Sequence, residues 1–289
     1  WLKVPHLSRM VPRALPRFAT GVVLGAAAAA SCLLLWRRAV ACAGMRLAAP
    51  AAQATARSAG GRPRVALTPE LRQASAETLA DYGAVAEGYA AGNLNHDVSQ
   101  NMNALLRALE GRPAPLDILD LGCAGGRDLA AFTRMGHRAV GVDGVPSFCE
   151  MARQVSGCEV WQQDFQELSL PPAAFDGVFA NACLFHVPSA SLPDVLQEVA
   201  QSLRDGGALF VSNAHGFGED QEGWTGGRTP GTKSYVCWLS EETWCRYCRQ
   251  AGFELIESFY RPPGKPRSQQ PFLATVWRKR SAGAGAAGE

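Results

Sequence analysis

Three aspartates lie where short apolar runs end, at positions where carboxylates could bind a polar ligand. Asp120, Asp143 and Asp164 each close a β-rich run, and Asp143 follows Asp120 by 23 residues. An acid at that interval, on the strand after a small-residue loop, can accept hydrogen bonds from ribose hydroxyls. The alternative for Asp143 is the capping of a following helix. The order and spacing of the three acids favour a nucleoside site.

A loop of small residues follows the first aspartate. Residues 116–128 read LDILDLGCAGGRD, so an apolar run leads through the loop into a helical pattern. Glycine is needed where a backbone turns tightly or approaches a ligand closely, and the start of the next helix favours an anionic group. A nicotinamide-binding loop that began at Gly122 would require glycine where the chain has Ala124 and Arg127. This spacing disfavours a nicotinamide oxidoreductase.

These residues need a sheet that brings the strand ends together. Apolar β-rich runs alternate with helical patterns, which predicts a parallel sheet with helices on both faces. The predicted strands are 116–121, 139–142, 159–162, 177–180 and 208–212, with helices around 127–135, 146–155 and 191–204. A helix at 241–251 and strands at 254–260 and 272–277 follow.

The end of the chain distinguishes between α/β folds. No helix fits between the last two predicted strands, so they must pair as antiparallel neighbours. We therefore expect an α/β, Rossmann-like fold with a seven-stranded sheet that is mostly parallel, with an antiparallel last strand and helices on both faces. An ordinary dinucleotide-binding domain lacks such a terminal hairpin.

Four segments, in order, resemble the motifs of class I S-adenosylmethionine (SAM) methyltransferases. The acid-x-Gly-x-Gly-x-Gly loop of that family matches Asp120, Gly122 and Gly126, with Ala124 in the middle glycine position. The other three segments are GVDG at 141–144, QDF at 163–165 and FDGVFANACLFHVP at 175–188. The resemblance covers roughly residues 81–280 and implies SAM as the cofactor, bound in part by this loop.

The resemblance also implies further roles in SAM binding. Asp143, followed by Gly144 in the same motif, would hold the ribose. Asp164 would meet the adenine amino group, with Phe165 along the ring. The residues around Asn181 would lie beside the methionine part and the transferred methyl group.

Two further segments are expected to shape the site. DYGAVAEGY at 81–89 resembles the helix that closes over SAM in many small-molecule methyltransferases, with Tyr82 and Tyr89 on one face; ordinary core packing is the alternative for both. The long Gly-rich segment 216–235 is expected to be a lid or binding loop, because loops of that length in compact domains are usually functional. A mobile surface insertion is its alternative.

Methyl transfer from SAM is an in-line displacement, so a general base is needed only for an acceptor that is protonated at working pH. His186, just beyond the fourth strand, and His215, after the fifth, are the candidate catalytic residues. A structural role in the turn before Pro188 is the alternative for His186.

The charge distribution divides the chain in two. Residues 1–69 hold ten basic residues and no acidic ones, a charge of +10, whereas the rest holds 18 basic and 26 acidic residues, a net charge of −8. The apolar run 18–36 between arginines suits a signal peptide, and the Ala/Arg-rich stretch after it is typical of a transit peptide. We expect a targeting leader at 1–68, a methyltransferase domain at 69–280 and a disordered tail at 281–289. The expected address is the plastid, with a mitochondrion or a membrane anchor through 18–36 as alternatives.

Two alternatives to a small-molecule methyltransferase are a tRNA-modifying methyltransferase and a non-catalytic SAM-binding protein. RNA binding requires a basic face, which the −8 body disfavours. Basic residues gather only near the last hairpin, at Arg261, Lys265, Arg267, Arg278, Lys279 and Arg280. We expect a small-molecule acceptor, no nucleic acid, membrane contact only through an uncleaved leader, and a monomer or homodimer.

The cysteines predict free thiols in a reducing compartment. Cys245 and Cys248 have metal-like spacing, but no second pair accompanies them, and we expect no metal site.

Overall fold

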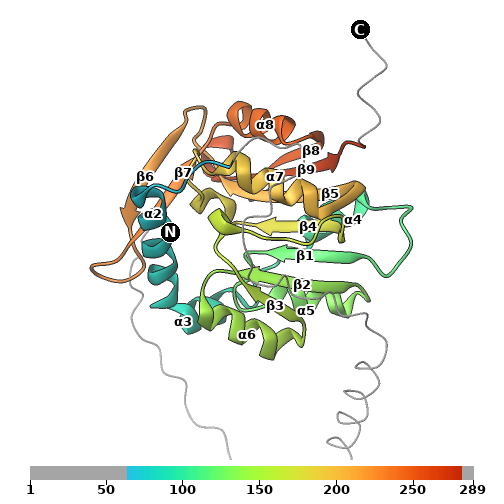
Figure 1. The fold of residues 1–289 in the computed structure, drawn as a ribbon, viewed down its shortest axis with the longest axis horizontal. Coiled ribbons are helices and arrows are strands. Elements are labelled where there is room, and N and C mark those ends of the chain that lie inside the picture. Colours follow the sequence, from blue (N-terminus) through green and yellow to red (C-terminus); the bar gives the residue numbers. More distant parts are fainter. Residues whose placement is uncertain (1–63, 282–289) are drawn as a thin grey trace, which may run out of the picture. The chain divides into compact units, whose positions relative to one another are not determined.

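A seven-stranded sheet forms the centre of the computed structural model, which describes residues 64–281 (Figure 1). β9 is antiparallel to both of its neighbours, whereas the pairs from β3 to β5 are parallel. The predicted Rossmann-like sheet with an antiparallel last strand is confirmed. In spatial order the strands are β3 (Glu159–Gln162), β2 (Arg138–Asp143), β1 (Asp117–Leu121), β4 (Phe175–Asn181), β5 (Leu203–Ala214), β9 (Phe272–Lys279) and β8 (Phe253–Arg261).

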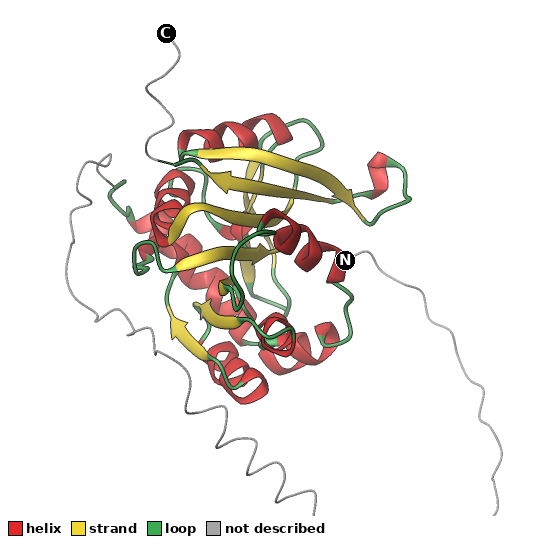
Figure 2. Cartoon of the chain, turned by 90° about the vertical axis from the view of Figure 1, so that its right-hand side faces the viewer, coloured by secondary structure: helices red, strands yellow, loops and turns green. Residues whose placement is uncertain are grey.

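Helices flank this sheet (Figure 2) because its strands are apolar on both faces. β1 is buried along its whole length. On one side Leu105 packs with Ile118, Phe132 and Phe210 in a single hydrophobic cluster. The helices are α2 (Pro69–Gly83), α3 (Ala86–Asn93), α4 (Ser99–Ala108), α5 (Arg127–Arg134), α6 (Pro146–Ser156), α7 (Leu192–Ser202) and α8 (Glu241–Gln250). The sequence patterns do not predict α4, whose apolar positions complete this cluster.

The segment 216–235 contains a hairpin, so the expectation of a loop is wrong. β6 (Gln221–Gly226) and β7 (Lys233–Trp238) form a separate two-stranded antiparallel sheet. Trp224 pairs with Tyr235 across the strands, with ring centroids 5.4 Å apart, and such aromatic pairs stabilise hairpins. The high glycine content hides this signal in the sequence. Figure 1 shows the hairpin beside α2, at one end of the main sheet.

The segment 81–89 is not one continuous helix. α2 ends at Gly83 and α3 begins at Ala86, with a turn between them in which the amide of Val85 donates to the carbonyl of Tyr82. Tyr82 and Tyr89 still meet, with ring centroids 5.2 Å apart in an edge-on arrangement. The turn therefore changes the direction of the chain but keeps both tyrosines on the same side.

The predicted leader and tail lie almost entirely outside the described residues, and their targeting and anchoring roles stay predictions. The first described residues already contact the domain. Arg64 donates to the carbonyl of Leu168 at 2.9 Å, and the amide of Val65 donates to Asp194 at 2.6 Å. Within residues 64–281, no helix combines the length and apolar character that crossing a bilayer requires.

Candidate active site

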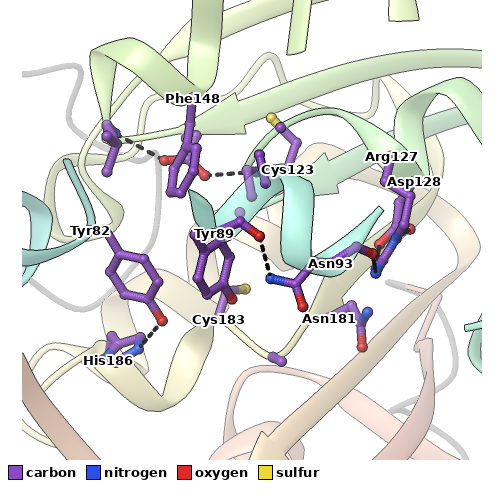
Figure 3. A pocket seen from close by; sticks show the side chains of 18 of the residues that line it. Tyr82, Tyr89, Asn93, Cys123, Arg127, Asp128, Phe148, Asn181, Cys183 and His186 are labelled. Carbon is purple, nitrogen blue, oxygen red and sulfur yellow. Dashed lines mark hydrogen bonds and ion pairs between the residues drawn. The ribbon is translucent and has the colours of Figure 1, made fainter. Parts of the chain in front are cut away.

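A cavity of about 670 Å³ opens where the parallel strands end (Figure 3). The loops after β1, β2, β3 and β4 line one part of it, and α2, α3 and the segment between α3 and α4 cover it. The end of β8 and the start of β9 line the far part. Its volume is in the range of cofactor and ligand sites. Nine of the eleven predicted cofactor residues line it, namely Gly122, Ala124, Asp143, Gly144, Asp164, Phe165, Asn181, Tyr82 and Tyr89.

The loop after β1 turns through backbone conformations that favour glycine. Gly122 has a φ of +77°, and a Cβ there would lie 2.6 Å from the Cβ of Cys183, so only glycine fits. Ala124 adopts a φ of +43°, in the left-handed region that side chains disfavour. A Cβ on Gly126 would lie 2.7 Å from the Cα of Ala152 on α6. Gly126 therefore packs against a helix and does not line the cavity, contrary to its predicted contact with the cofactor.

Asp120 does not reach the cavity either, so its assignment to cofactor contact is wrong. Its side chain is 1% exposed, and one carboxylate oxygen is buried without a hydrogen-bond partner. Burial, reinforced by the nearby Asp128 carboxylate, raises the pKa of Asp120 well above its ordinary value. The residue is a buried acid beneath the loop.

Asp143 stands at the end of β2 and faces the cavity. Its two carboxylate oxygens accept hydrogen bonds from the amides of Ala124 and Val145, each at 2.9 Å. Burial raises the pKa of Asp143 to about 6, although these amides and that of Gly144 oppose the shift. Each carboxylate oxygen has a second lone pair. The side chain can therefore hold the loop and still accept hydroxyl hydrogens from a ligand.

Asp164 and Phe165 line the same part of the cavity, after β3. One oxygen of Asp164 accepts from the amide of Gln166 at 2.9 Å, and the other accepts from the hydroxyl of Ser75 on α2. The predicted adenine end of the site is thus bounded by α2 as well as by the strand loops.

Asn181 ends β4 and lines the middle of the cavity. Its side-chain oxygen accepts from the amide nitrogen of Asn101 on α4 at 2.9 Å. Asn101 is fully buried, and its contact fixes the orientation of the Asn181 amide. Asn101 could not be predicted from the sequence, because a lone Asn in a helix carries no distinctive spacing.

His186 and Tyr82 form a hydrogen-bonded pair in the cavity wall (Figure 3). Nδ1 of His186 lies 2.7 Å from the carbonyl oxygen of Tyr235, and Nε2 lies 2.8 Å from the hydroxyl of Tyr82. Because a carbonyl can only accept, Nδ1 carries the proton and the tyrosine donates to Nε2. Burial lowers the pKa of His186 to about 4. The histidine is therefore neutral and already engaged at both nitrogens.

The β6–β7 hairpin is fastened to this wall by a buried carboxylate. Asp81, with no exposed surface, accepts from Ser234, from Thr232, and from both the backbone and the side chain of Arg228. Burial raises the pKa of Asp81, but these hydrogen bonds outweigh it and bring the pKa to about 2. The Arg228 guanidinium lies 3.4 Å from the centroid of the Tyr82 ring. One contact network thus joins the hairpin, α2 and Tyr82.

His215 lies outside the main cavity, so the expectation that it lines the acceptor site is wrong. It is 4% exposed and borders a separate, much smaller cavity of about 10 Å³. Its Nδ1 accepts from the amide of Phe217, and its Nε2 lies 2.8 Å from the carbonyl oxygen of Gln270. These contacts hold the loop after β5 against the connector between β8 and β9.

The far part of the cavity contains two arginines that were not predicted as site residues. Arg127 binds both oxygens of Asp128 and donates to the carbonyl of Asn93 at 3.0 Å. Arg261 also lines the cavity. Burial lowers the pKa of its guanidinium, the nearby Arg127 cation lowers it further, and the Asp97 carboxylate only partly opposes this shift. The only available signal for Arg261 is its membership of a basic run near the last hairpin.

The described part of the chain contains no cluster of three or more His, Cys, Asp or Glu side chains that could hold a metal ion. Cys245 and Cys248 are free thiols buried on α8.

The fold and the cavity define a class of protein that the family comparison identifies. Residues 94–258 match a family model described as a methyltransferase domain, which is more than half of the chain. The chain belongs to this family and is a class I SAM-dependent methyltransferase domain. The predicted resemblance is thus confirmed, and SAM is the cofactor that the family implies. The carboxylates of Asp143 and Asp164 can accept hydrogen bonds from hydroxyl and amino groups of a ligand, and the glycine loop lets the backbone approach that ligand closely. These properties fit a nucleoside.

Individual relatives match over shorter stretches. A ubiquinone biosynthesis O-methyltransferase from Xanthomonas campestris pv. campestris is 32% identical over 101 residues, or 33% of this chain and 41% of the relative. One from Azoarcus sp. is 30% identical over 155 residues, or 48% of this chain and 64% of the relative. This chain thus spans less than two thirds of the length of these curated relatives.

A solved structure shares the fold. The 1,6-didemethyltoxoflavin-N1-methyltransferase of Burkholderia thailandensis, with bound 1,6-didemethyltoxoflavin and S-adenosylhomocysteine, has a TM-score of 0.59 and 23% identity. The match covers 76% of this chain and 93% of that one.

Proposed function

We propose that this chain transfers the methyl group of SAM to a small-molecule acceptor. The observation that carries the proposal is the continuous cavity, which extends from Asp143 and Asp164 past Asn181 to Phe272 and Arg261. SAM supplies an electrophilic methyl group on its sulfonium. The residues predicted to bind it lie in one part of the cavity, so the remaining part is available to an acceptor that approaches in line.

The protein's own residues contribute alignment and exclusion of water, which suffice for an in-line displacement. Asn181, held by Asn101, lies where the two parts of the cavity meet. α2 and α3 cover the site, whereas the hairpin, expected to shape the acceptor site, contributes no residue to the cavity lining and packs against α2 through Asp81. His186 is predicted as a catalytic residue, but its pKa of about 4 makes it a weak base at neutral pH. We propose that it orients the Tyr82 hydroxyl, which lines the cavity.

The contacts of the basic residues disfavour the tRNA alternative. Lys279 donates to the carbonyl of Leu203, Arg278 donates to that of Ala108, and Arg267 stacks on Tyr260. These groups are engaged in separate local contacts, whereas an RNA-binding face needs free cations gathered together.

The test is a search for product. The purified chain is incubated with SAM labelled on its methyl group and with metabolite extracts or unmodified tRNA. We expect label in a low-molecular-mass product, none in tRNA, and much less product from D143A when SAM is limiting. Binding of SAM without any labelled product would favour the non-catalytic alternative, and labelled tRNA would overturn the small-molecule assignment.

A further inference from the structure

Arg261 is a cation in the cavity wall that lacks an anionic partner. Its Nε atom is buried without a hydrogen-bond partner, and its Nη2 reaches only the carbonyl of Asp97, at 3.4 Å. The ion pairs within residues 64–281 do not include it. The carboxylate of Asp97 accepts instead from the amide of Ser99.

The other two arginines near the cavity are paired. Arg127 holds both oxygens of Asp128, and Arg228 is bound to the buried Asp81. Removing a charged group from water costs free energy unless a counter-charge and hydrogen bonds replace the water. The Nε group of Arg261 is withdrawn from water but has neither a counter-charge nor a hydrogen-bond partner, so its counter-charge is expected to arrive with a ligand.

The position of Arg261 in the sheet indicates which ligand this is. Asn181, Ser212, Ala274 and Phe259 are in register across β4, β5, β9 and β8. Arg261 lies two residues beyond Phe259, on a strand that runs parallel to β4. Three strand spacings, roughly 14 Å in all, separate β8 from β4. Arg261 is thus remote from the predicted nucleoside end and faces the part of the cavity left for the acceptor.

The lining between these points is largely apolar and limits the chemistry of the acceptor. It includes Leu94, Val98, Pro262, Pro271 and Phe272. One guanidinium can bind a carboxylate through two parallel hydrogen bonds and match its single charge. A phosphate monoester would bring close to two charges to a site with one unpaired cation.

We propose that Arg261 binds the carboxylate of the methyl acceptor, so that the substrate class is small, mostly apolar organic acids. This rests on the proposed methyl transfer. The acid is oriented with its carboxylate at the end of β8 and its methyl-accepting atom towards Asn181. Arg261 is then a residue that determines acceptor specificity.

The experiment compares acids with their neutral amides. Isothermal titration calorimetry is run on the full chain saturated with S-adenosylhomocysteine, using 4-hydroxybenzoate and 6-hydroxy-2-naphthoate and the primary amide of each. The variants are R261Q and R261K, with K265Q as the matched control. Lys265 is an exposed cation on the same connector that does not line the cavity. SAM affinity is measured for every variant, which also verifies folding.

We expect the wild type and K265Q to bind at least one acid about tenfold more tightly than its amide. R261Q should bind both forms equally within about twofold, and R261K should retain part of the preference, because it keeps the charge but loses the planar fork. SAM affinity should stay within about twofold in all variants.

Three results would overturn the proposal: no binding or no acid preference in the wild type, an acid preference that survives in R261Q, or a tenfold loss of SAM affinity in R261Q. The last would assign Arg261 to the cofactor's own carboxylate. Acid binding through Arg261 without methyl transfer to any acceptor would instead refute the proposed function alone.

Discussion

The strand-end wall of the cavity and its helical cover are assembled in different ways. In the wall, Asp143 holds its own loop and the neighbouring one through the amides of Val145 and Ala124. The cover is held by contacts that are remote in the chain, since Asp81 of α2 binds Arg228, 147 positions away. The wall is built from adjacent strand ends, and the cover from packing between separate layers.

This difference teaches where sequence motifs carry information. In a parallel sheet the loops at neighbouring strand ends lie side by side, regardless of which elements cover them. Short sequence motifs therefore describe that part of the site well. The cover depends on how α2 packs against β7, and the buried carboxylate of Asp81 is the most enclosed of the polar contacts that stabilise that packing. Substitutions should therefore affect stability most in the cover and ligand binding most in the cofactor loops.

The largest expected effect is on the stability of the cover. D81A leaves the partly exposed guanidinium of Arg228 without its partner and removes the acceptor for Ser234 and Thr232. We expect the free energy of unfolding to fall by about 2–4 kcal/mol, because several hydrogen bonds to a buried carboxylate are lost while the Arg228 cation can be rehydrated. Denaturant unfolding measures it, with E254A at an exposed carboxylate as the control, expected within about 0.5 kcal/mol of wild type.

A loss below about 1 kcal/mol in D81A would contradict the role of Asp81 as the fastening of the hairpin. Because its pKa falls from 3.8 to about 2 on folding, Asp81 contributes stability above pH 4. That contribution should disappear as the pH falls through 2.

The next effect is on cofactor binding. D143A removes a charged acceptor for the ribose hydroxyls, and SAM affinity should weaken by about 1–3 kcal/mol. Calorimetric titration with SAM measures this change. D143N, which keeps one acceptor oxygen, should fall between D143A and the wild type. An unchanged SAM affinity in D143A would show that Asp143 only stabilises the loops through its backbone hydrogen bonds and does not bind the ribose.

The pH dependence of SAM binding should follow the same side chain. With a pKa of about 6, the free protein carries a protonated Asp143 in acid and a carboxylate at neutral pH. Hydroxyl donors favour the carboxylate, so SAM affinity should fall about tenfold from pH 7 to pH 5. D143N should show a flat profile, and an equally steep profile in that variant would assign the dependence to another group.

The raised pKa of Asp143 also has a cost for the fold. Between its unfolded value of 3.8 and about 6, the folded chain binds more protons at this residue than the unfolded chain. Its contribution to stability therefore falls as the pH rises through this range and stays low above pH 6. At neutral pH the ionised Asp143 therefore lowers the free energy of unfolding, whereas the ionised Asp81 raises it.

The smallest effect concerns the backbone of the cofactor loop. Ala124 has a φ of +43°, and A124G should relieve that strain. The greater entropy of glycine in the unfolded chain offsets part of the gain, so we expect an increase in stability below about 1 kcal/mol. Thermal unfolding of A124G, with A173G at another positive φ for comparison, measures it. A marked loss of stability would mean that the Ala124 methyl group packs in a way that outweighs the strain.

Much of the sheet and of the cofactor part could be predicted from the sequence. The alternation of apolar strands and helices defines a parallel sheet, and the lack of room for a crossover α-helix before residue 272 requires the antiparallel β9. Asp143 and Asp164 line the cavity as their spacing suggests, and Asn181 lines it as the family resemblance implies. These features depend on periodicity and on adjacent strand ends, which are local properties of the chain.

The tertiary structure alone decided which neighbours each remaining side chain meets. Asp120 was predicted to contact the cofactor from its place in the motif, but its side chain is buried beneath the loop. His215 was predicted to line the acceptor site, but it is held by the β8–β9 connector. Arg261 looks like one of several surface cations, yet it enters the cavity wall. Burial and pairing depend on groups far away in the sequence, and only the packed fold brings those groups within hydrogen-bonding distance.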